Sequence, residues 1–224
     1  MSAESPSSPR RFRLRWSRAD SVATQTILAL GMVLVGLTFL ASLLWITPLL
    51  PAEGLGRFAQ ITVHQPMGAP ATVPDVEPVV DDVTIVEEPK MTLRFEDPST
   101  LQRLMLVLST LLTQAAALTI LYLILRVLRS LDQGDPFVPA NVRRIYTIAL
   151  TMILAAILVP TADGFAGLFL QHGVVPEDGM VLVSFTLSLE SGPLVALLAG
   201  LLLAALAEVF RRGARMRDDV EGLV

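Results

Sequence analysis

The sequence predicts an all-α membrane bundle of four transmembrane helices, with both chain ends in the cytoplasm and a small antiparallel β-sheet on the extracytoplasmic side. Three observations predict this fold class: four long apolar stretches, an uneven distribution of arginine, and strand-like alternation between the helices. Of the 224 residues, 53% are hydrophobic and 17% are charged, whereas soluble domains carry about 25% charged residues. The composition therefore indicates a surface covered largely by lipid.

Four stretches without a charged residue are long enough to cross a bilayer. They are residues 21–52, 104–125, 145–162 and 191–207. A bilayer core about 30 Å thick needs roughly 20 helical residues, with about 17 as the lower limit. The first stretch is much longer than the apolar part of a secretory signal, about 7–15 residues, and no A-x-A-like cleavage site follows it. We therefore expect it to be retained as a membrane anchor.

The basic residues predict the orientation of the helices. Residues 1–20 contain five arginines, whereas residues 51–103 contain four basic and nine acidic residues, and residues 163–190 contain no Lys or Arg. Cytoplasmic loops are the ones enriched in Lys and Arg, so both termini and the connection between helices 2 and 3 are expected inside. The predicted segments are a basic cytoplasmic segment (1–20), helix 1 (21–50), an extracytoplasmic loop with short strands (51–100), helix 2 (101–131), a cytoplasmic loop (132–142), helix 3 (143–162), an extracytoplasmic loop with a strand (163–190), helix 4 (191–212) and a cytoplasmic tail (213–224).

Short strands are predicted in both extracytoplasmic loops. In the first loop, residues 58–64 and 91–95 alternate in polarity and residues 83–86 are β-branched, while the proline-rich residues 67–82 read as a linker. In the second loop, residues 181–189 alternate with a period of two. Because a lone strand leaves its backbone groups unpaired, we expect these strands to form one sheet. The alternative is that both loops are disordered connectors.

The segment between helices 2 and 3 reads GDPFVPAN, residues 134–141. Gly134 suits a left-handed ending of helix 2, and Pro139 suits the first turn of helix 3. Phe137 is an aromatic residue at headgroup depth. This segment reads either as a turn with a hydrophobic plug or as a docking surface for a cytoplasmic partner, and the two interpretations are compatible.

Helix 4 carries an acid at its inner end. Arg211 and Arg212 follow Glu208 by three and four residues, a spacing that pairs side chains on one helix. The alternative is an ion pair between Glu208 and an arginine of a neighbouring helix: Arg126, Arg129 or Arg143. Gly213 is expected to interrupt the helix soon afterwards.

A row of small residues runs along helix 4. Gly192, Ala196, Gly200 and Ala204 recur at every fourth position, and such residues let helix backbones approach closely in lipid. We expect this row to pack against another helix of the bundle or against a second subunit.

Polar residues inside the apolar stretches predict bonds between helices. They are Thr24 and Gln25 in helix 1 and Thr110, Thr113 and Gln114 in helix 2. A transport path past Thr113 and Gln114 is the functional alternative. Asp163 is expected at the outer end of helix 3, in contact with water.

The sequence contains no pattern of an enzyme. It has no cysteine, and its two histidines, His64 and His172, fall in different loops and are a weak metal signal. No phosphate-binding loop, nucleophile elbow or zinc-protease helix is present. We therefore expect no catalytic activity, no catalytic residue, no cofactor and no metal site.

Two segments resemble a known family. The segment GDPFVPANVRRI before helix 3 and the C-terminal LAEVFRRGARMRDDVEGLV are similar to a bacterial family of four-helix integral membrane proteins, domain of unknown function 2975. The resemblance runs from helix 1 to the last residue and is weakest in the first outer loop. Family members often have a polar residue where this chain has Val138-Pro139.

The resemblance implies a regulatory rather than a catalytic protein. No activity is established for the family, and its genes often lie beside a small helix-turn-helix regulator. By analogy, the chain is expected to be a sensory or regulatory component of the bacterial cytoplasmic (inner) membrane that contacts such a regulator and does not itself bind nucleic acid. The matching positions are Gly134, Pro136, Phe137, Asn141, Arg144, Glu208, Phe210, Gly213 and Glu221.

Two other functions remain open. The first is a small transporter or channel. The second is a structural membrane protein that forms homo-oligomers through helix 4.

Overall fold

The computed structural model describes residues 18–47, 59–64, 90–132, 139–172 and 192–221, with the side chains of residues 18, 19, 63, 64, 90, 91 and 214–221 left out. Its elements follow the order α1 (Arg18–Ile46), β1 (Gln60–His64), β2 (Lys90–Arg94), α2 (Thr100–Asp132), α3 (Pro139–Gln171) and α4 (Gly192–Glu221). Each of these helices contains a segment that is long and apolar enough to cross a membrane. The chain is therefore a multi-pass membrane protein with a small antiparallel sheet.

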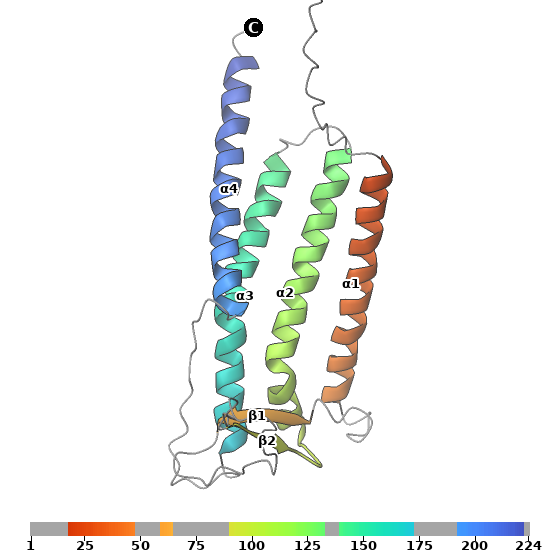
Figure 1. The fold of residues 1–224 in the computed structure, drawn as a ribbon, viewed down its shortest axis with the longest axis vertical. Helices are drawn as coiled ribbons and strands as arrows, with labels where there is room; N and C mark the ends of the chain where they lie inside the picture. The colour runs from red at the N-terminus through yellow and green to blue at the C-terminus, as the bar shows by residue number, and fades with distance from the viewer. Residues whose placement is uncertain (1–17, 48–58, 65–89, 133–138, 173–191, 222–224) are drawn as a thin grey trace, which may run out of the picture.

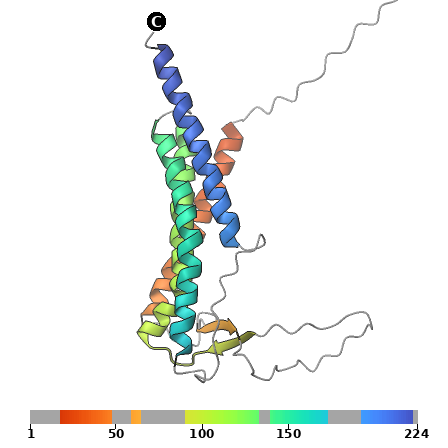
Figure 2. The same ribbon diagram turned by 90° about the vertical axis from the view of Figure 1, so that its left-hand side faces the viewer.

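The helices pack in chain order as an open bundle. α1 contacts α2, α2 contacts α3, and α3 contacts α4, whereas α1 and α4 share no extensive contact within the described elements. In Figure 1 the four helices accordingly stand in a row, with the sheet at the lower end. Figure 2 shows α4 crossing the other helices obliquely. We call the end that carries β1 and β2 the sheet end, and the end where α1 begins and α4 ends the opposite end.

The first two helices lie close to their predicted bounds. α2 begins and ends within one residue of the prediction. α1 begins three residues earlier than expected and ends at Ile46 rather than residue 50. The physical reason is Pro48, since the residue before a proline avoids the α-helical conformation. Thr47 is accordingly in a bend.

The predicted end of α3 at residue 162 was wrong. The helix begins at Pro139, which suits a first turn but lies four residues before the predicted start at 143, and it continues through Pro160 to Gln171. Proline is tolerated inside membrane helices because neighbouring groups can satisfy the backbone that it frees. As a result Asp163 lies within the helix and not in a loop.

The predicted interruption of α4 was also wrong. The helix passes through Gly213 and ends at Glu221. A glycine costs a helix only about 1 kcal/mol relative to alanine, and arginine and alanine next to it are good helix formers. In Figure 1 the C-terminal part of α4 therefore extends beyond the ends of α1, α2 and α3.

The sheet has two antiparallel strands, with Thr62 opposite Thr92. Their hydroxyl oxygens lie 3.4 Å apart, and the pairing is extended by a bond from the Phe95 amide to the Ala59 carbonyl, 2.8 Å. The strands predicted at residues 58–64 and 91–95 are thus confirmed. The strands predicted at 83–86 and 181–189, the linker at 67–82 and the ending of helix 2 at Gly134 lie outside the described residues.

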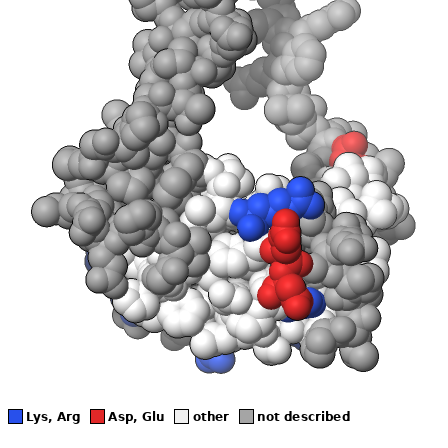
Figure 3. Space-filling model, turned by 90° about the horizontal axis from the view of Figure 1, so that it is seen from below, with Lys and Arg blue, Asp and Glu red and all other residues white. Residues whose placement is uncertain are grey.

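Charges of both signs meet near the sheet. Arg94, Glu96 and Asp97 are exposed there. Figure 3 views the molecule from this end, and the acidic and basic side chains lie next to one another rather than in separate patches. The sheet end therefore presents no described surface of a single sign.

Side chains along the helices confirm that the bundle needs lipid. Ile27, Leu30 and Leu202 are at least 70% exposed, and large apolar residues are exposed along all four helices. In water this surface drives association. In a bilayer it faces acyl chains.

Candidate functional site

At the opposite end, a hydrogen-bonded group joins α1 to α2. The hydroxyl of Ser21 lies 2.8 Å from both carboxylate oxygens of Asp132. The amide nitrogen of Gln25 donates to Asp132 Oδ2 at 2.5 Å and to Ser21 Oγ at 3.1 Å. The prediction that Gln25 bonds across helices is confirmed. Thr24 differs, because its hydroxyl bonds to the Asp20 carbonyl of its own helix.

A second group joins α2 to α3 at the same end. Asn141 is only 2% exposed. Its Nδ2 donates to Ser130 Oγ at 3.0 Å, and its Oδ1 accepts a bond from Arg144 Nη1 at 2.8 Å. Arg144 Nη1 also donates to the carbonyl of Arg126, 3.1 Å away. The two groups together tie the first three helices at this end.

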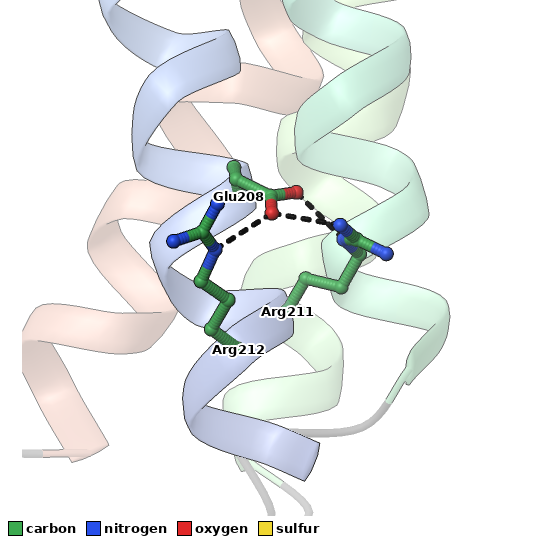
Figure 4. Close-up of polar contacts among 3 residues, drawn as sticks. All are labelled: Glu208, Arg211 and Arg212. Carbon is green, nitrogen blue, oxygen red and sulfur yellow. Dashed lines mark hydrogen bonds and ion pairs between the residues drawn. The ribbon is translucent and has the colours of Figure 1, made fainter. Parts of the chain in front are cut away.

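Glu208 forms ion pairs within α4. Its carboxylate lies 2.6 Å from Arg211 Nε and 2.9 Å from Arg212 Nε, as Figure 4 shows. The interpretation as a local pair within helix 4 is confirmed. Both arginines are exposed, so they remain accessible to a partner.

The row of small residues in α4 packs inside the chain at Gly200. A methyl group there would lie 2.8 Å from Cγ1 of Ile153 and 3.0 Å from the carbonyl oxygen of Ala149. These distances are shorter than a real side chain allows, so the absence of a side chain at Gly200 permits the observed distance between α3 and α4. The row is not uniform, because Gly192 has open space around the same position.

Toward the sheet end, α2, α3 and the beginning of α4 line an open pocket of about 440 Å³. Pro160 of α3 and Pro193 in the first turn of α4 both line it, so the pocket lies where α4 begins. The lining residues are Ser109, Thr110, Thr113, Gln114, Val159, Pro160, Asp163 and Pro193.

The pocket gathers polar groups that are distant in the sequence. Ser109 Oγ donates to Asp163 Oδ1 at 3.2 Å, whereas the hydroxyl of Thr113 donates to the Ser109 carbonyl of its own helix at 2.9 Å. The side-chain oxygen of Gln114 is buried and has no hydrogen-bond partner. An uncompensated acceptor of this kind is costly in a protein interior. The charged group that the pocket exposes is the carboxylate of Asp163.

A family model described as a protein of unknown function, DUF2975, matches residues 58–224. The chain belongs to the DUF2975 family. The resemblance of the two motifs is thereby confirmed, although the match begins after α1, whereas the resemblance was expected to start there. No curated protein and no solved structure matches this DUF2975 chain.

The residues that the family resemblance indicated in the DUF2975 protein fall into separate groups. Asn141 and Arg144 of α3 bond to each other, whereas Glu208, Phe210 and Gly213 belong to α4, where Glu208 pairs with Arg211 and Arg212. Glu221 is the last helical residue, and its side chain is outside the described part. Gly134, Pro136 and Phe137 also lie outside it.

Sequence reasoning missed two features of the candidate sites. It did not select Ser21 and Asp132. Their signal in the sequence was that each is a polar residue near the end of a long apolar stretch. It placed Asp163 in a loop, although its spacing of four residues from Val159 and three from Pro160 was compatible with one helical face. The pairing of Ser109 with Asp163 depends on the register of α2 against α3, which no pattern in a single sequence reveals.

Proposed function

We propose that this DUF2975 protein is a sensory or regulatory membrane component that contacts a cytoplasmic protein through its opposite end. The observation that carries the proposal is the continuity of α4. Its apolar segment ends at Gly213, but the helix goes on to Glu221. Residues 214–221, which we call the arm, contain Arg, Asp and Glu and extend past the other helices (Figure 1).

The arginine distribution supports a cytoplasmic position for the arm. Arg126, Arg129, Arg143 and Arg144 lie near the opposite end, where α2 ends and α3 begins. By the positive-inside rule this end faces the cytoplasm, and the sheet lies outside. A bacterial cytoplasmic membrane is the compartment that the family resemblance implies.

The packing offers a way for the two ends to communicate. α4 is fitted to α3 at Gly200, and α3 is bonded to α2 through Asn141. A change in the spacing of α2 and α3 would therefore alter the position of the arm. Regulation of this kind requires two arrangements of the helices with different affinity for the partner.

The family resemblance suggests a small helix-turn-helix regulator as the partner. Mixed charges on a projecting helix are suited to a protein surface, because complementary charges select and orient a partner. In this proposal DNA is contacted by the regulator and not by the membrane protein.

Co-purification from native membranes tests the arm. One variant ends at Gly213 and lacks the arm, and its matched control ends at Glu221 and lacks only residues 222–224. Both carry an N-terminal tag, so that equal amounts in the membrane can be verified. We expect a helix-turn-helix protein to be recovered after crosslinking with the control and lost with the shorter variant. Equal recovery with both variants would refute the arm as the contact.

A small transporter is the second candidate, and the pocket with Asp163 favours it. The pocket lies toward the sheet end: along α2, Ser109 is about six residues or roughly 9 Å from Arg103, whereas Gln114 is about 12 residues or roughly 18 Å from Arg126 in the other direction. A path would have to continue along α2 and pass the two hydrogen-bonded groups at the opposite end. A flux assay on liposomes tests this candidate. Flux equal to that of empty vesicles would exclude it.

A further inference from the structure

We propose that the pocket between α2, α3 and the start of α4 binds a small organic cation, an ammonium group attached to an apolar body. The carboxylate of Asp163 would receive the ammonium group. This inference concerns the sheet-end half of the molecule and does not depend on a cytoplasmic partner.

The Asp163 carboxylate is the charged acceptor of the pocket. The Ser109 hydroxyl donates to Asp163 Oδ1, and the Thr113 hydroxyl donates to a backbone carbonyl, so neither hydrogen is available to a ligand. Asp163 is exposed, so the rest of its carboxylate can accept hydrogen bonds from a ligand in the pocket.

The charge of the pocket is negative. Asp163 is an acid, and none of the eight lining residues is Lys or Arg. Asp163 also belongs to an apolar helix long enough to cross the membrane. Acidic groups in such segments are usually paired or part of a functional site, and a bound cation would provide the missing charge.

The size and walls of the pocket favour an organic cation over a bare metal ion. Pockets for small molecules range from about 300 to 1,000 Å³, and this one has about 440 Å³. Val159, Pro160 and Pro193 supply apolar walls for the body of the ligand. In the described part of the chain, no group of three His, Cys, Asp or Glu residues is arranged to hold a metal ion.

Direct binding to the full-length protein in non-ionic detergent tests the proposal. The probe is benzylammonium, and benzyl alcohol, which has a similar shape but no charge, is the control ligand. We expect saturable binding of benzylammonium that is weakened about tenfold or more by Asp163→Asn, the loss expected for one charged hydrogen bond. Asp97→Asn is the matched control variant, because it removes an exposed carboxylate near the sheet and leaves the pocket intact, and its affinity should be unchanged.

A second variant keeps the proposal testable if Asp163→Asn fails to fold. Gln114→Glu adds a negative charge to a second residue of the pocket lining, so it should bind benzylammonium more tightly than the unmodified protein does. Equal binding of benzylammonium and benzyl alcohol would show a pocket for apolar molecules and overturn the proposal. The absence of saturable benzylammonium binding at millimolar concentrations, or unchanged affinity in both pocket variants, would overturn it as well.

Discussion

The guanidinium group of Arg103 donates a hydrogen bond to the carbonyl oxygen of Trp45, 3.2 Å away, and lies 5.4 Å from the centre of the Trp45 ring. It donates another bond to the Pro98 carbonyl at 3.1 Å. Trp45 is fully buried and packs with Ala59 and Val107. The last turn of α1, the first turn of α2 and the start of β1 are therefore joined at one buried arginine.

Replacing Arg103 should destabilise the sheet end. Arg103→Ala removes two hydrogen bonds to helix and loop carbonyls and the contact with the indole ring, and it leaves the buried Trp45 carbonyl without this donor. Hydrogen bonds to charged groups contribute about 1.5–3 kcal/mol each, so we expect the free energy of unfolding to fall by on the order of 3 kcal/mol. Thermal or denaturant unfolding in non-ionic detergent measures this change.

Arg94→Ala is the control for that experiment. Arg94 is an exposed residue of β2, and exposed substitutions usually change stability by no more than about 0.5 kcal/mol. If the two alanine variants unfolded alike, the burial of Arg103 would have no energetic consequence.

Gly200 and Gly36 provide a matched pair for helix packing. An added methyl group at Gly200 meets Ile153 and the Ala149 carbonyl, whereas Gly36 in α1 has no such neighbour within 4 Å. Alanine favours a helix over glycine by about 1 kcal/mol. We therefore expect Gly36→Ala to be neutral or stabilising, and Gly200→Ala to be destabilising by about 1–3 kcal/mol from overpacking.

Unfolding of the two glycine variants in the same detergent decides this prediction. Equal unfolding midpoints of the two variants would mean that α3 accommodates the added methyl group without loss of stability. The oligomeric state of Gly200→Ala is a useful second measurement, because the contact of Gly200 lies within one chain and its loss should not by itself change the number of subunits.

The four helices and two strands were predictable because they follow from properties that are local in the sequence. An uncharged stretch of about 20 residues has only a helix as a stable form in lipid, and alternation identified the strands that became β1 and β2. The errors came from Pro160 and Gly213. Both are helix breakers in water, but in this chain one lies among packed membrane helices and the other among strong helix formers.

The candidate sites were less predictable because they depend on which helix faces which. The local pair of Glu208 with Arg211 was predictable from a spacing of three residues. The bond between Ser109 and Asp163 spans 54 residues and the one between Ser21 and Asp132 spans 111. Each requires a helix register and rotation that one sequence does not determine.

Asn141 should be sensitive to the type of substitution. Asn141→Leu leaves Ser130 and Arg144 without their buried partner, and unsatisfied polar groups cost about 1–3 kcal/mol each. Asn141→Asp retains the acceptor for Arg144 and can accept a bond from the Ser130 hydroxyl, so it should unfold close to the unmodified protein. Unfolding midpoints in detergent compare the two. If leucine were tolerated as well as aspartate, packing rather than hydrogen bonding would hold α2 and α3 together there.

Asp132 and Glu208 are acids near the same end of the molecule, and truncating each to alanine distinguishes a bond between helices from a bond within one. Asp132→Ala removes the acceptor that joins α1 to α2 through Ser21 and Gln25, so the free energy of unfolding should fall by on the order of 1 kcal/mol. Glu208→Ala removes exposed pairs confined to α4, and exposed ion pairs of this kind contribute little, so the unfolding midpoint should not change measurably. The unfolding of both variants is measured at low and at high salt in the same detergent. A large loss of stability in Glu208→Ala would contradict the local pairing and favour the alternative in which Glu208 binds an arginine of a neighbouring helix.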